Sequence, residues 1–228
     1  MFILGDVHAN ADFMNSFIES NEKYCIQLGD FGFIWNYGDW KWNKFLNKFE
    51  KEYPNKTIFV VPGNHENYDS FMKLPQVEIF GAKAYKVREN IFYIKRGEIL
   101  EIENTTFLCI GGADSTDKAW RIEEYEISGI KCWWQQETIQ QSDINNALRN
   151  LEKYSGRVDY VCSHAEPRWA INEIMPWAQE SQSENLLGDL SRQVECGIWF
   201  GGHIHESLNV KGRDFDVMTL GEGCFCCV

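Results

Sequence analysis

The segment Thr57-Ile58-Phe59-Val60-Val61-Pro62-Gly63-Asn64-His65-Glu66 decides the fold of this chain. Its β-branched first half predicts a strand over Thr57–Val61, which runs directly into a polar turn. Before it, Tyr24–Leu28 predicts another strand, and the three- and four-residue apolar spacing within Asp39–Tyr53 predicts an amphipathic helix. This strand–helix–strand order is typical of parallel βαβ units in an α/β fold.

The order of the expected elements changes further along the chain. Short apolar runs from Ala84 to Ile110 follow one another without helices, which predicts a second, partly antiparallel sheet. Gly111–Gln136 is rich in tryptophan and charge and has no regular pattern, so we expect an irregular segment that could act as a lid. We expect one domain over residues 1–228. Other strands are expected over Phe2–Leu4, Val158–Cys162 and Ile198–Phe200, and helices over Asp12–Ser20 and Glu137–Tyr154.

The 228 residues include 34 acidic and 22 basic residues, which gives a formal net charge of −12. A surface of this sign repels polyanions, so we expect no extended nucleic-acid binding, although solubility alone also explains the acidity. The sequence holds no run of about 18 apolar residues and begins with a strand-like run, so we expect no membrane span and no signal peptide. The eight cysteines then indicate reduced thiols and a cytoplasmic location.

All five histidines lie in short clusters that also contain aspartate, asparagine, serine or glycine. Each cluster follows an expected strand, and the carboxyl ends of such strands meet at one edge, where sites form. Carboxylate, amide and imidazole ligands together suit Mn, Fe, Zn or Mg. A lone histidine near a strand end is usually structural, but this arrangement predicts a metal site with two ions. The clusters are Gly5-Asp6-Val7-His8, Gly29-Asp30, Gly63-Asn64-His65-Glu66, Ser163-His164 and Gly202-His203-Ile204-His205.

These blocks resemble the signature of the calcineurin-like metallophosphoesterases, which is D-x-H, G-D, G-N-H-[DE], H and G-H-x-H in that order. They span residues 5–205, nearly the whole chain. The resemblance implies a four-layer α-β-β-α sandwich of two mixed sheets flanked by helices. The protein Ser/Thr phosphatase branch is not indicated, because the run after Gly29-Asp30 lacks the Asp-Arg pair of that branch and Pro62 replaces its arginine.

The resemblance also implies a role for each residue of the blocks. His65 resembles the family's catalytic histidine, which contacts the phosphate, and Glu66 would be the carboxylate that orients it. Asp30 would bridge the two ions with its two oxygens. One ion would be held by Asp6, His8, Asp30 and His205, and the other by Asp30, Asn64, His164 and His203.

We therefore expect a metal-dependent phosphoesterase that uses metal-activated water and forms no covalent intermediate. Phosphodiester or nucleotide-like substrates, including an oligonucleotide end, are favoured because aromatic side chains are abundant. The alternatives are a DNA or RNA nuclease, a phosphomonoesterase, and a non-catalytic, metal-stabilised interaction scaffold. Manganese is the expected metal, Fe, Zn, Ni, Co and Mg are also compatible, and the oligomeric state stays open.

Three residues outside the blocks are candidates for substrate binding. Arg121 and Arg168 could clamp a phosphate through paired hydrogen bonds, and surface ion pairs are the alternative for both. Trp133 could stack on a nucleobase, with core or lid packing as its alternative.

Overall fold

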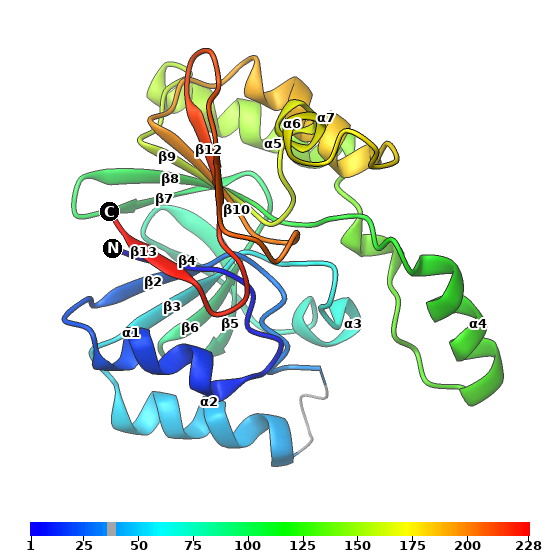
Figure 1. The fold of residues 1–228 in the computed structure, drawn as a ribbon. Helices are drawn as coiled ribbons and strands as arrows, with labels where there is room; N and C mark the ends of the chain where they lie inside the picture. The colour runs from blue at the N-terminus through cyan, green and yellow to red at the C-terminus, as the bar shows by residue number, and fades with distance from the viewer. Residues whose placement is uncertain (36–39) are drawn as a thin grey trace.

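The computed structural model describes residues 1–35 and 40–228. Two mixed β-sheets pack face to face, and helices cover the outer side of each sheet, which gives four layers (Figure 1). This arrangement confirms the α/β class and the α-β-β-α sandwich predicted from the sequence. Among the described residues, no helix is both long and apolar enough to cross a membrane.

The first sheet has seven strands. Strands β1, β2, β3 and β6 run parallel, and antiparallel strands close both edges. The parallel strands are buried along nearly their whole length, as expected of strands that are covered on both faces. The order is β13 (Phe225–Cys227), β1 (Phe2–Leu4), β2 (Tyr24–Gln27), β3 (Thr57–Val60), β6 (Ile91–Ile94), β5 (Ala82–Arg88) and β4 (Gln76–Ile79).

The second sheet has six strands, of which β8, β9, β10 and β12 run parallel. The expectation that Ala84–Ile110 lies in one sheet was wrong. β6 is buried at all four positions and pairs in parallel with β3, so β5 and β6 belong to the first sheet and β7 and β8 to the second. The order is β11 (Leu208–Val210), β12 (Asp216–Thr219), β10 (Ile198–Gly201), β9 (Tyr160–Ser163), β8 (Thr105–Ile110) and β7 (Glu98–Ile102).

Two groups of helices form the outer layers (Figure 1). The first sheet is covered by α1 (Asn15–Glu19), which continues a 3-10 turn at Ala11–Met14, and by α2 (Trp40–Glu52). The second sheet is covered by α5 (Gln141–Leu151), α6 (Arg168–Ile174) and α7 (Gln182–Ser191). The remaining short elements are α3 (Tyr68–Phe71) and 3-10 turns at Gln135–Glu137 and Glu152–Tyr154.

The segment Gly111–Gln136 is not irregular throughout, because it contains α4 (Lys118–Ser128). Figure 1 shows this helix as an arm that projects from the body. Its apolar side chains surround the helix axis: Trp120 is 59% exposed, Tyr125 50% and Ile127 75%. A helix without an apolar stripe on one face has no periodic signal, which is why the pattern did not predict it.

Three apolar clusters join the four layers. The middle cluster lies between the sheets and includes Ile26 and Phe59 of the first sheet and Phe107 and Phe200 of the second. This cluster sets the position of β1, β2 and β3 relative to β9 and β10. The loops that follow these five strands are therefore held at fixed positions relative to one another.

Phe59 is fully buried in the middle cluster. Phe59→Ala should lower the free energy of unfolding by about 3–5 kcal/mol, because the sheets cannot close the cavity that it leaves. The control is Trp120→Ala on α4, which should change the same quantity by less than about 0.5 kcal/mol. Denaturant unfolding followed by circular dichroism measures both, and equal losses in the two variants would contradict this assignment of the core.

Candidate metal centre

Loops at the carboxyl ends of strands from both sheets meet at one place. The His164 ring donates to the Leu28 carbonyl at 2.8 Å, and the backbone N–H of His203 donates to Asp6 Oδ1 at 3.3 Å. The structure thus brings together the metal-site residues expected from the sequence. They follow β1 (Asp6, His8), β2 (Asp30), β3 (Asn64, His65), β9 (His164) and β10 (His203, His205).

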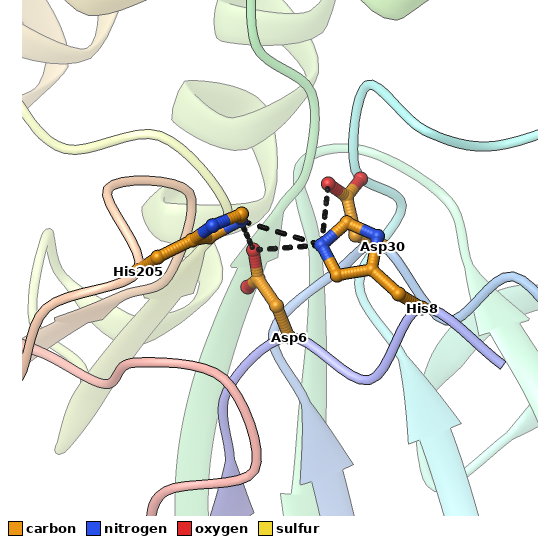
Figure 2. Close-up of side chains that lie close together, drawn as sticks. All are labelled: Asp6, His8, Asp30 and His205. Carbon is orange, nitrogen blue, oxygen red and sulfur yellow. Dashed lines mark hydrogen bonds and ion pairs between the residues drawn. The ribbon is translucent and has the colours of Figure 1, made fainter. Parts of the chain in front are cut away.

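Four of these side chains point toward one another, as Figure 2 shows for Asp6, His8, Asp30 and His205. His205 Nε2 lies 3.1 Å from Asp6 Oδ2 and 3.3 Å from His8 Nε2. Asp30 Oδ2 lies 3.8 Å from the same His8 nitrogen. One ligand atom from each residue lies within 4.8 Å of the other three, so a single cation could contact all four.

Two buried oxygens of this group, Asp6 Oδ2 and Asp30 Oδ2, have no hydrogen-bond partner among the described residues. Burial raises the pKa of Asp30 well above its usual value, and the nearby carboxylates of Asp6 and Glu66 raise it further. Buried charges in proteins are normally paired or bound to metals, because isolated ones are very costly. Carboxylate and imidazole donors suit divalent ions such as Mn²⁺ and Zn²⁺, so these residues fit a metal ion.

A second set of donor atoms lies at the other oxygen of Asp30. His164 Nε2 is 2.9 Å from Asn64 Oδ1 and 3.5 Å from Asp30 Oδ1. Because His164 Nδ1 donates to a carbonyl, and burial lowers the pKa of His164 to about 3, Nε2 carries a lone pair. Two acceptors, Nε2 and the Asn64 oxygen, thus face each other, and a cation between them would relieve their repulsion.

Ser115 was not expected from the sequence, yet it determines how Asn64 is oriented. The Asn64 amide donates to Ser115 Oγ at 3.1 Å, which leaves the amide oxygen directed at His164. Ser115 is held in turn by Glu137, whose carboxylate accepts the Ser115 N–H at 2.8 Å. No local motif marks this serine, because it lies in the loop after β8 and reaches Asn64 only through the fold.

The backbone around these side chains is strained. Left-handed φ values cost a residue with a Cβ atom about 1–2 kcal/mol, and such strain concentrates at functional sites. Gly63 and Gly202 permit close approach instead, because a Cβ atom at either would collide with an oxygen of Asp30 or Asp6. The ligand candidates with φ between 47° and 57° are His8, Asp30, His203 and His205.

His65 is the residue at which the site meets the α4 arm. Nη2 of Arg121, on α4, lies 2.7 Å from His65 Nε2. Burial, followed by this guanidinium, lowers the pKa of His65 to about 3. Arg121 is only 4% exposed, and its Nε pairs with Asp117 at 2.8 Å. Arg121 thus forms the ion pair that was its alternative, but its side chain is buried and also contacts His65.

Glu66 contacts a different partner from the one expected. Its oxygens accept hydrogen bonds from the Phe31 N–H at 2.8 Å and from the Tyr93 hydroxyl at 2.7 Å. Burial raises the pKa of Glu66 to about 7. Phe31 directly follows Asp30, so Glu66 supports the Asp30 loop, whereas the ring of His65 is contacted by Arg121.

The other two candidates for substrate binding differ in their surroundings. Arg168 donates to the carbonyls of Ala178 and Gln179 and to Glu184, at 2.7–2.8 Å, so its guanidinium is used within the α6–α7 connection. These contacts do not support the expected phosphate clamp. Trp133 lines a groove of about 400 Å³ beside Arg121.

One carboxylate close to the metal-site residues had no signal in the sequence. Glu222, between β12 and β13, places Oε1 3.1 Å from His205 Nδ1 and 3.7 Å from His8 Nε2. It belongs to no recognised motif and reaches the site because β13 pairs with β1.

One known family accounts for most of the chain: a sequence model of the calcineurin-like phosphoesterases matches residues 2–207. Among solved structures, the chain is similar to phosphopantetheinyl hydrolase from Mycobacterium tuberculosis, at 11% identity and a TM-score of 0.47, over 97% of this chain and 89% of that one. It is also similar to a dimetal phosphatase from Danio rerio, at 14% identity and a TM-score of 0.46, over 96% of this chain and 77% of that one. No curated protein sequence matches the chain.

Asp30 faces both sets of donor atoms, so the loss of its charge should weaken both. Asp30→Asn should reduce the manganese bound per chain and remove most of the rise in Tm that manganese gives the wild type. A ligand at about 100 times its Kd stabilises a protein by about 2.7 kcal/mol, which such a shift would report. Asp12→Asn, at an exposed position, is the control. Unchanged metal stoichiometry in Asp30→Asn would contradict the bridging position.

Proposed function

The chain belongs to the calcineurin-like phosphoesterase family, and we propose that it hydrolyses a phosphate ester at a centre of two divalent metal ions. The observation that carries this proposal is a pair of buried oxygens, one on Asp6 and one on Asp30, that have no hydrogen-bond partner in the described part of the chain and face imidazole nitrogens. A cation would stabilise these oxygens, and metal-dependent hydrolysis is the chemistry expected from the family. Both considerations support Asp6 and Asp30 as metal ligands.

The residues divide into two ligand sets that share Asp30. When bound, two such ions polarise a phosphoryl group and lower the pKa of a water molecule that can attack it. Manganese is our proposed metal, and Fe, Zn, Ni, Co and Mg accept similar ligands. One ion would be held by Asp6, His8, Asp30 and His205, and the other by Asp30, Asn64, His164 and His203.

His65 and Arg121 would act on the substrate. The His65 ring lies 5.3 Å from that of His8, between centroids, and contacts the Arg121 guanidinium. Phosphate oxygens are stronger acceptors for arginine than an imidazole nitrogen, so a bound phosphate would draw Arg121 away from His65. His65 would then be available to give a proton to the leaving oxygen.

Phosphodiester or nucleotide-like substrates suit the surroundings of Arg121. The adjacent groove is lined by Ile122, Tyr125 and Trp133, whose apolar and aromatic surfaces suit the organic part of such an ester. The net charge of −12 disfavours extended polyanions, so a nuclease acting on a strand end is the second candidate. A phosphomonoesterase and a non-catalytic scaffold are the outcomes that the following experiment separates from these.

Metal-stripped protein should hydrolyse bis-p-nitrophenyl phosphate when manganese is added, and should turn over p-nitrophenyl phosphate only weakly. His65→Ala is the matched control: it should keep its metal but lose about 10²–10⁴-fold in kcat, the usual contribution of general acid catalysis. Turnover of the monoester alone would make the protein a phosphomonoesterase. Two bound metals without turnover of either ester would favour the scaffold.

Trp133→Ala tests the groove. Stacking on a base contributes about 1–3 kcal/mol, so KM for a nucleotide-like diester should rise roughly 5- to 150-fold, with KM for a non-aromatic ester unchanged. Trp177→Ala, at a side chain that is 79% exposed, is the matched control and should leave both constants unchanged. Equal effects of Trp133→Ala on the two esters would show that Trp133 only packs.

A further inference from the structure

The geometry points to Glu222 as a positioning residue of the metal centre, whose carboxylate holds the His205 ring so that Nε2 can bind a metal ion. This inference rests on the proposed function, because it requires that His205 binds metal together with Asp6, His8 and Asp30. Glu222 lies beyond residues 2–207, the stretch that the family matches. The C-terminal turn would thus add to the metal centre a residue that lies outside the stretch matched by the family.

The two ring nitrogens of His205 face two different carboxylates. Nδ1 lies 3.1 Å from Glu222 Oε1, and Nε2 lies 3.1 Å from Asp6 Oδ2. In metal sites, the ring nitrogen that does not bind the metal usually donates its N–H to a carboxylate, which fixes the tautomer and the ring orientation. Glu222 Oε1 is close enough to take that role for Nδ1–H when a bound metal ion fixes the ring. The lone pair of Nε2 is then directed toward Asp6 and His8, where the ion would lie.

The turn that carries Glu222 is bonded to the loop that carries Asp6. Gly223 N–H donates to the Asp6 carbonyl, and Gly5 N–H donates to the Cys224 carbonyl, both at 2.9 Å. A further bond of 3.0 Å, from Cys224 N–H to the Gly221 carbonyl, closes the turn itself. Because β13 also pairs with β1, Glu222 and Asp6 are held at a fixed separation on the two sides of His205.

A purely structural role for this carboxylate is a weaker explanation. The Glu222 side chain is 44% exposed, and its described ionic contacts are with two histidines, His205 and His8. Exposed ion pairs contribute little to folding stability. Next to the proposed ligands His8 and His205, this carboxylate would instead strengthen metal binding. It would orient His205 and add negative charge beside the ion.

Manganese binding to the metal-stripped protein, measured by calorimetry, tests this role. Glu222→Ala should weaken the binding of one ion by about 10- to 100-fold, the usual effect of removing such a carboxylate. Glu222→Gln should lose less, because its amide oxygen can still accept the Nδ1–H. Glu206→Ala is the matched control: it removes the same charge from an exposed residue next to His205 and should bind manganese as the wild type does.

A second readout does not depend on metal. In the metal-stripped protein, Glu222 and Asp6 lie equally close to the two ring nitrogens of His205. Glu222→Ala should therefore increase the share of proton at Nε2 relative to the wild type, which ¹⁵N NMR of the histidine rings measures. Circular dichroism of the same samples confirms that each variant is folded.

The outcomes separate this inference from the proposed function. A wild type that binds no manganese would overturn the proposed function and the inference together. A wild type that binds manganese, with Glu222→Ala binding it equally tightly, would overturn only the role of Glu222. An equal loss of manganese affinity in Glu206→Ala would also overturn the role of Glu222, because the effect would then come from removing any negative charge near His205.

Discussion

Two carboxylates buried at one point, with too few hydrogen-bond donors for their oxygens, are the constraint on which the rest of the structure depends. Asp6 and Asp30 are at most 1% exposed, and Oδ2 of each lacks a partner among the described residues. Such a pair is unfavourable unless a proton or a cation neutralises it. The neighbouring loops add imidazole nitrogens that would be ligands for such a cation, and they do so at strained backbone positions such as His8 and His205.

The two-sheet fold makes this junction possible. The first sheet delivers Asp6, Asp30 and Asn64, the second delivers the three histidines that follow β9 and β10, and the cluster between the sheets fixes one set relative to the other. Elements outside this frame add further side chains. The α4 arm brings Arg121 to His65, and the C-terminal turn brings Glu222 to His205. The geometry of the metal centre therefore depends on residues that lie far apart in the chain.

The sequence predicted what depends on local patterns. Apolar runs that end in glycine, aspartate, asparagine and histidine marked both the strands and the ligand candidates. Ser115 and Glu222 could not be predicted, because each reaches the site through tertiary contacts and belongs to no motif. Glu66 follows His65 in sequence, but its side chain turns toward Phe31 and Tyr93, so adjacency in the chain was a poor guide to contact. Helix α4 was missed because it buries almost none of its surface, with Arg121 as its one buried side chain in the described structure.

The central claim is that Asp30 joins two metal ions, and anomalous diffraction from crystals grown with manganese tests it most directly. Two anomalous peaks are expected about 3.5–4 Å apart, the usual spacing of dinuclear sites, with one oxygen of Asp30 at each. A single peak, or peaks that Asp30 does not contact, would contradict it.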